Sequence, residues 1–166
     1  MYIFRKIKNF LLFNNEMRLL HLEALFYLGY ARLLKSLPFS KIMPLLGVSM
    51  DKTSINNFHS NSNRKLLEEI SSAIHLMSRF TLWESQCLVK AIAAMKMLEK
   101  RRIESILYLG TTKDRNGKLI AHAWLRSGNY YLTGAEEMNK FAVVYRIAKL
   151  YSNQNEGELN GNQTQS

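Results

Sequence analysis

Three stretches of the chain repeat apolar residues at three- and four-residue steps, the spacing of a helix that is buried along one side. They cover residues 14–37, about 64–80 and about 85–101. The first is expected to begin at an asparagine cap, Asn14 or Asn15. The third is apolar around most of its circumference, which predicts a helix enclosed by other elements. The first helix is expected to bury Leu19, Leu20, Ala24, Tyr27, Leu28, Ala31 and Leu34.

Beyond the third helix the apolar residues alternate with polar ones, which predicts strands. Gly110 is expected to end the first strand, and Asn116-Gly117 to form a turn in the loop 111–117 that follows it. Ser127-Gly128 is expected to be the tight turn of a hairpin. Helices followed by an antiparallel sheet predict the α+β class, with the helix 85–101 packed on the sheet. The strands are expected at 103–110, 118–126, 129–134 and 141–147.

Polar stretches divide the chain into a helical region, a core and a tail. Residues 1–47 are expected to form an N-terminal helical region, and residues 48–63 a polar linker. Residues 64–151 are then the core domain, and the polar residues 152–166 a disordered tail. No stretch has the length of a signal-peptide core or of a membrane span, so a cytoplasmic protein without membrane attachment is expected.

The formal net charge is +10 over 166 residues, but the basic residues are dispersed and form no nucleic-acid-binding motif. A basic surface that meets an acidic peptide or partner is the simpler expectation, and nucleic acid is not expected to bind. The single cysteine, Cys87, cannot form an internal disulfide and fits a reducing compartment. Neither a cluster of metal ligands nor a Gly-rich phosphate loop is present, so no metal and no other cofactor is expected.

Cys87 stands where the helix 85–101 begins, and it is either a small apolar filler or a nucleophile. Unpaired N–H groups and the dipole at a helix start stabilise an anion, so a thiolate is favoured there. Together with the side chain of Gln86, these N–H groups could donate hydrogen bonds to an oxyanion.

A nucleophilic thiol needs a base, and His122 is the best candidate among the four histidines. It lies in the middle of a strand, on the face that alternation assigns to Trp124. If the Cys87 helix packs on that face, the imidazole and the thiol can meet. Structural roles are expected for the three others, which lie on helix faces or in the linker: His21, His75 and His59.

The group that would orient the imidazole stays open. With a turn at Ser127-Gly128, His122 pairs with Thr133, and no carboxylate stands there. The candidates for this third position are Asn129, Thr133, Glu136 and Glu137, or none of them.

The stretches "CLVKAIAAMKMLEKRRIESILYLG" and "AHAWLRSGNYYLTG" resemble the transglutaminase-like superfamily, an α+β fold related to papain. More narrowly, they resemble the lasso-peptide biosynthesis B protein in its discrete protease form. The shared features are a cysteine and a leucine at the helix start, the arginines that close the helix, the "LYLG" strand, and His-Ala-Trp in the strand after it. The stretch "LPFSKIMPLLG" is also similar, and the likeness covers most of residues 14–145.

The resemblance implies a cysteine protease that removes the leader peptide from a ribosomally made lasso-peptide precursor. Carried over, Cys87 attacks the scissile carbonyl, and His122 acts as general base and then as general acid. The Asp that the family has downstream of its His falls near Thr133-Gly134 here, where this chain has no carboxylate. No leader-binding module is fused to this chain, which implies a separate leader-recognition protein as partner, and the lasso cyclase as a further one.

Two alternatives stay open. An acyltransferase or amidase on the same fold would share the Cys87 thioester and pass the acyl group to an amine. A non-catalytic binding protein with a degenerate site would account for the missing carboxylate.

Overall fold

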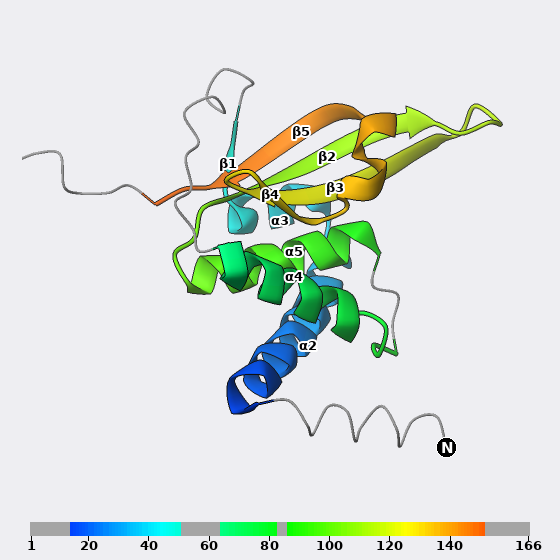
Figure 1. Ribbon diagram of the computed structural model, residues 1–166. Helices are drawn as coiled ribbons and strands as arrows, with labels where there is room; N and C mark the ends of the chain where they lie inside the picture. The colour runs from blue at the N-terminus through cyan, green and yellow to red at the C-terminus, as the bar shows by residue number, and fades with distance from the viewer. Residues whose placement is uncertain (1–13, 51–63, 83–85, 152–166) are drawn as a thin grey trace, which may run out of the picture.

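A layer of helices covers one face of an antiparallel sheet in the computed structural model, which describes residues 14–50, 64–82 and 86–151 (Figure 1). The sheet has the strand order β1-β5-β2-β3-β4, and every neighbouring pair is antiparallel. This architecture confirms the expected α+β class. In chain order the elements are α2 (Asn15–Lys35), α3 (Phe39–Leu46), β1 (Val48–Ser49), α4 (Arg64–Met77), α5 (Cys87–Lys100), β2 (Ser105–Lys113), β3 (Leu119–Ser127), β4 (Tyr130–Thr133), the 3-10 helix η2 (Ala135–Lys140) and β5 (Ala142–Lys149).

Helix α2 begins as its sequence predicts, with Asn14 as the N-cap. The Asn14 side chain accepts a hydrogen bond of 2.7 Å from the backbone N–H of Glu16. The helix buries most of the expected stripe, but Leu19 is 66% exposed. The prediction for Leu19 was wrong because the buried face of α2 is centred on Ala24, Leu28 and Ala31, and at about 100° per residue Leu19 points more than about 90° away from that centre.

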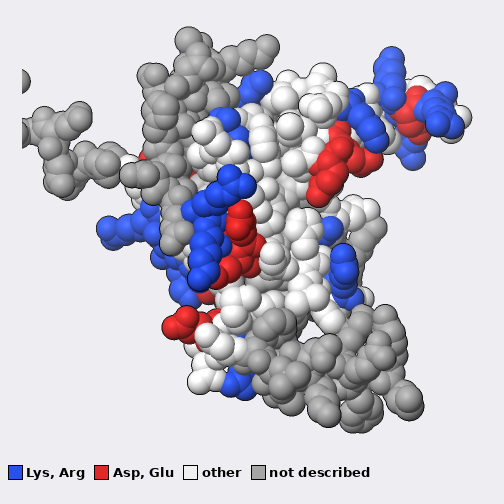
Figure 2. All heavy atoms as spheres, viewed as in Figure 1, with Lys and Arg blue, Asp and Glu red and all other residues white. Residues whose placement is uncertain are grey.

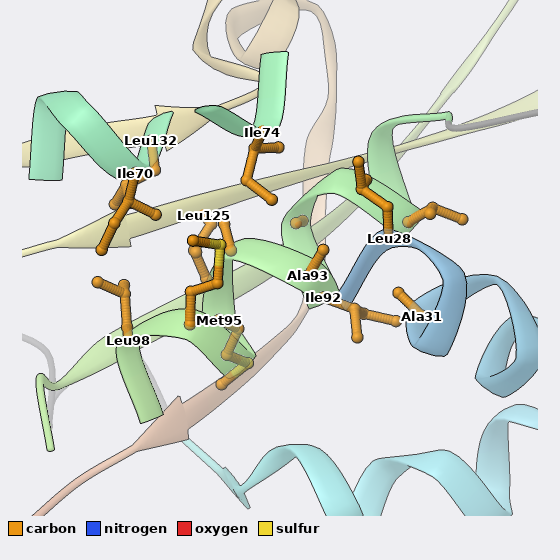
Figure 3. Packing of buried hydrophobic residues seen from close by; sticks show 14 of the residues in the cluster. Leu28, Ala31, Ile70, Ile74, Ile92, Ala93, Met95, Leu98, Leu125 and Leu132 are labelled. Carbon is orange, nitrogen blue, oxygen red and sulfur yellow. The ribbon is translucent and has the colours of Figure 1, made fainter. Parts of the chain in front are cut away.

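Helix α5 is enclosed, as its apolar circumference predicts. Eight of its fourteen residues are buried, among them Ile92, Ala93 and Met95. Side chains of α2, α4 and the sheet close around it in one cluster (Figure 3). Burial on all sides holds the body of α5 in place, whereas its first residue, Cys87, is only partly buried at the margin of this packing.

Strand β2 runs through Gly110 to Lys113, so the prediction that Gly110 ends it was wrong. A side chain at Gly110 would place its Cβ 2.9 Å from the ring of Trp124 and 2.9 Å from the Cβ of Phe141. The glycine therefore permits close packing over the strand instead of breaking it.

The hairpin between β3 and β4 turns one residue later than expected. Ser127 pairs with Tyr130, so Gly128 and Asn129 form the turn, and an irregularity between Leu125 and Arg126 shifts the register again. Gly128 has φ +53°, a conformation that the first central residue of such turns requires and that glycine adopts without strain. The predicted pairing of His122 with Thr133 was consequently wrong, because Thr133 pairs with Leu125.

The expected linker 48–63 begins with structure. Val48 and Ser49 form β1 and pair with Ala148 and Ile147 of β5, so the linker prediction was wrong for these two residues. Residues 51–63 and the expected disordered tail 152–166 lie outside the described part of the chain. None of the described helices combines the length and the apolar character of a bilayer-spanning segment.

Candidate active site

Cys87 is the first residue of α5, and its side chain is partly buried at the margin of the helical core. The first N–H groups of a helix have no acceptor within the helix, and they carry the positive end of its dipole. The first intrahelical bond described in α5 runs from the N–H of Lys90 to the carbonyl of Gln86, at 3.1 Å. The thiol therefore stands beside N–H groups that could donate hydrogen bonds to an oxyanion.

Gln86, the oxyanion candidate, is the N-cap of α5, and its side chain makes no cap hydrogen bond. Its Oε1 accepts a hydrogen bond of 3.1 Å from the Nζ of Lys35, the last residue of α2. This contact ties the C-terminal end of α2 to the residue that precedes the thiol.

His122 lies in β3 opposite Gly110 and is packed between aromatic rings. Its ring stacks on Phe141 at 4.9 Å and on Trp124 at 5.8 Å between centroids. Its Nε2 lies 2.8 Å from the backbone carbonyl oxygen of Gly134. Because a carbonyl oxygen can only accept, Nε2 carries the proton, and Nδ1 is the nitrogen that can take up another one.

The two faces of the sheet separate Cys87 from His122. Ala123 and Leu125 of β3 belong to the core cluster that contains α5, together with Cys87 at its margin. Trp124, on the other hand, belongs to a second cluster without residues of α2, α4 or α5. Since side chains alternate along a strand, His122 shares the face of Trp124. The condition under which the imidazole and the thiol would meet, packing of α5 on the His122 face, is therefore not met, and no hydrogen bond joins His122 to Cys87 in the described residues.

The hydrogen bond that orients the imidazole comes from the backbone. Gly134 supplies it from a left-handed conformation with φ +74°. The Thr133 hydroxyl is buried and makes no hydrogen bond in the described part of the chain. Asn129 lies exposed at the hairpin turn, and Glu136 is exposed at the start of η2. No sequence signal identifies such a carbonyl, because every residue has one.

Glu137 is the carboxylate among the four candidates that interacts electrostatically with His122. Its Oε1 accepts a hydrogen bond of 2.9 Å from the Nζ of Lys140. This bond and the charge of Lys140 hold the pKa of Glu137 below its usual range, and the charge of His122 adds to the lowering. Glu137 is exposed, so water screens these interactions.

Two other histidines have structural roles, as expected. His21 is 2% exposed and its Nδ1 bonds to the backbone carbonyl of Met17 in the preceding turn. His75 donates from Nε2 to the carbonyl of Leu132 at 3.3 Å, an acceptor that it shares with the hydroxyl of Ser71. His59 lies outside the described residues.

Within residues 14–50, 64–82 and 86–151, no three His, Cys, Asp or Glu side chains are grouped so that they could hold a metal ion.

A thiol at the start of a buried helix, followed by a strand histidine with an oriented ring, is a set of groups suited to acyl transfer through a thioester. No curated protein and no solved structure matches the chain. The family model described as the transglutaminase-like superfamily matches residues 25–146, which include α4, α5, β2, β3 and β4. That range also contains both Cys87 and His122, and it covers most of the chain. The chain therefore belongs to the transglutaminase-like superfamily.

Proposed function

We propose that this chain is a cysteine peptidase that removes the leader peptide from a ribosomally made lasso-peptide precursor, together with a separate leader-recognition protein. Membership of the transglutaminase-like superfamily supports thiol-based acyl chemistry in general. The observation that carries the proposal is Cys87 as the first residue of the enclosed helix α5. The resemblance of residues 87–110 and 121–134 to the discrete B proteins supports the narrower substrate.

In the proposed reaction the Cys87 thiolate attacks the scissile carbonyl carbon, and the helix-start N–H groups stabilise the oxyanion that forms. The C–N bond then breaks, the core peptide leaves as an amine that receives a proton from the His122 imidazolium, and a leader thioester remains. His122 next takes a proton from water, which attacks the thioester. The products are the leader carboxylate and the restored thiol.

This reaction needs the Cys87 sulfur within hydrogen-bond reach of His122 Nδ1, although the two residues belong to different faces of the sheet. We propose that binding of the substrate and its recognition protein rearranges the start of α5 toward the edge of β3. Catalytic hydrogen bonds often form only in the complex with substrate, so a separation in the free protein is compatible with the role.

The same separation favours a second candidate function, a non-catalytic protein that binds the precursor through a degenerate transglutaminase-like domain. The deciding experiment incubates the purified chain with its precursor and leader-recognition protein and records product masses. The peptidase proposal expects a leader with a free carboxylate, absent with Cys87→Ala. A new amide in place of the free acid would indicate an acyltransferase, and unchanged precursor with the wild-type protein would support the binding protein.

A further inference from the structure

Helix α2 carries a second apolar face, which points away from the core. The residues of this exposed stripe recur at steps of three and four, so they lie in one row along the helix. Their side chains present roughly 600 Å² of apolar surface, at the upper end for the largest patch of a monomeric protein. The exposed stripe consists of Leu19 (66% exposed), Leu22 (52%), Phe26 (68%), Tyr30 (37%), Leu33 (72%) and Leu37 (46%).

Basic side chains border this stripe. Arg18 and Arg32 each precede a stripe residue by one position, which places them along one side of it. On the other side the Glu23 carboxylate forms ion pairs with Arg101 Nη1 at 2.7 Å and with Lys100 Nζ at 3.5 Å. The Lys100 side chain is 59% exposed, so this border presents a cation as well as the exposed carboxylate of Glu16 in the first turn of α2. Figure 2 shows Lys and Arg side chains dispersed over the visible face rather than gathered into one patch.

The C-terminal end of the stripe lies next to the candidate active site. Leu33 and Leu37 flank Lys35, whose Nζ donates the hydrogen bond of 3.1 Å to Gln86. Gln86 directly precedes Cys87. A protein that docks along α2 would therefore reach the end of the helix that Lys35 ties to Gln86, on the side of the helix opposite the Lys35 side chain.

We infer that the exposed stripe of α2 is the docking site for an amphipathic helix with acidic edges, supplied by the protein that brings the substrate. Apolar side chains in a heptad-like row bind the apolar side of a partner helix, and charges at the borders select the partner. Identifying that protein as the leader-recognition protein rests on the proposed function, whereas the surface itself does not.

Two occupants from this chain fit less well. A second copy would bring the basic borders of both α2 helices together, which opposes association. Residues 1–13 carry Arg5, Lys6 and Lys8 and would repel the same borders. Even as one helix they span only about 20 Å, so folding back from Asn14 would leave the second half of the stripe uncovered.

Two fluorescent peptides of about 20 residues test the inference, both with leucine at heptad positions a and d. One carries glutamate at positions e and g, and the other carries lysine there. Fluorescence anisotropy with the full chain at low salt is expected to give at least tenfold tighter binding of the glutamate peptide. Phe26→Ser and Leu33→Ser are each expected to weaken that binding about tenfold. The matched control is Leu119→Ser at the start of β3. It removes a leucine that is 66% exposed, close to the 68% of Phe26 and the 72% of Leu33, and it is expected to leave the affinity unchanged.

Equal binding of the two peptides would overturn the inference, as would stripe variants that bind like the wild type or a control variant that loses as much. A wild-type dimer that Leu33→Ser converts to a monomer in sedimentation would assign the stripe to a second copy. Tenfold tighter binding after removal of residues 2–13 would assign it to the chain's own N-terminal segment. Cys87→Ala is expected to bind like the wild type, so this result is independent of whether the peptidase proposal holds.

Discussion

The Nε2–H of His122 donates a hydrogen bond of 2.8 Å to the backbone carbonyl of Gly134. This bond fixes the tautomer and leaves Nδ1 as the basic nitrogen. A neutral carbonyl orients the ring but, unlike a carboxylate, adds no full negative charge to stabilise an imidazolium. The proposed general base is therefore positioned by the backbone.

Alkylation of the single thiol tests whether Cys87 and His122 act as a pair. With the precursor and its recognition protein present, we expect iodoacetamide to label the wild-type chain near pH 6 about tenfold faster than His122→Ala, because an imidazolium brought next to the thiol favours the thiolate. The measurement is the labelling rate by mass spectrometry between about pH 4 and pH 9, with and without the precursor and its recognition protein. His75→Ala is the matched control, since His75 already donates to Leu132. Identical profiles for the wild type and His122→Ala in both conditions would remove His122 from the proposal.

Substituting Gly134 is expected to damage the site. An added Cβ would lie 2.5 Å from the carbonyl oxygen of Ala123 and 3.1 Å from His122 Nε2, at a φ of +74°. Gly134→Ala should therefore cost about 2–4 kcal/mol of unfolding free energy, from strain and a displaced turn. Gly134→Asp should destabilise in the same way and leave leader cleavage lower, although it adds a carboxylate beside the imidazole.

Urea unfolding at neutral pH measures this cost. Gly117→Ala is the control, because its φ of +77° imposes the same strain while no atom lies within 4 Å of the added Cβ. We expect it to cost only about 1 kcal/mol. Equal losses at both positions would mean that the close approach to Ala123 is unimportant.

The ion pair between α2 and α5 predicts a loss of stability in acid. Burial alone would raise the pKa of Glu23, but hydrogen bonds and charges from Arg101 and Lys100 outweigh it and hold that pKa below its ordinary value of 4.5. A lowered pKa in the folded state stabilises the protein above about pH 4.5, and this contribution disappears as the pH falls through the lowered pKa.

Glu23→Gln should accordingly cost about 1–3 kcal/mol at pH 7 and progressively less below pH 4.5. Denaturant unfolding of both proteins at pH 7 and near pH 3 checks this. Glu137→Gln removes an exposed pair and should leave stability nearly unchanged at both pH values. A Glu23→Gln penalty that is constant with pH would show that charge is not its source.

The last described residue anchors the end of the sheet to α5. Tyr151 donates from its hydroxyl to the carbonyl of Glu99 at 3.0 Å, and from its backbone N–H to Glu104 Oε1 at 3.1 Å. A chain that ends at Tyr151 should keep both bonds and be as stable as the full chain. A chain that ends at Leu150 should lose about 1–2 kcal/mol of unfolding free energy. Thermal unfolding of the two truncations separates the anchor from any effect of residues 152–166.

The helices and most strands were predictable because burial on one side leaves a periodic pattern in the sequence. The errors arose where a residue type has two physical uses. Gly110 was expected to break a strand, but it admits the ring of Trp124. Gly128 was expected at the second turn position, but it occupies the first. That one-residue difference moved the predicted partner of His122.

The site was predictable only in its parts. Cys87 at the start of a helix follows from the apolar pattern of residues 88–98. The face on which His122 lies relative to α5 depends on the packing of a whole layer, and no local pattern encodes it. Phe141 stacks on His122, although the 3-10 helix η2 lies between the two residues in the chain. The sequence pattern predicts strands and turns but does not indicate which residues on either side of η2 come into contact.

The pairing of β1 with β5 has a consequence for how the chain is made. Val48 can pair only after Ala148 has been synthesised, 100 residues later in the chain. The outer edge of the sheet therefore cannot form until nearly all described residues have left the ribosome. The described helices all end by Lys100, apart from the 3-10 helix η2, so they can pack on one another before the strands that follow them are made, whereas long-range strand pairing is slow because it closes a large loop. Synthesis thus delivers the helix that begins at Cys87 first and the sheet that completes the domain last.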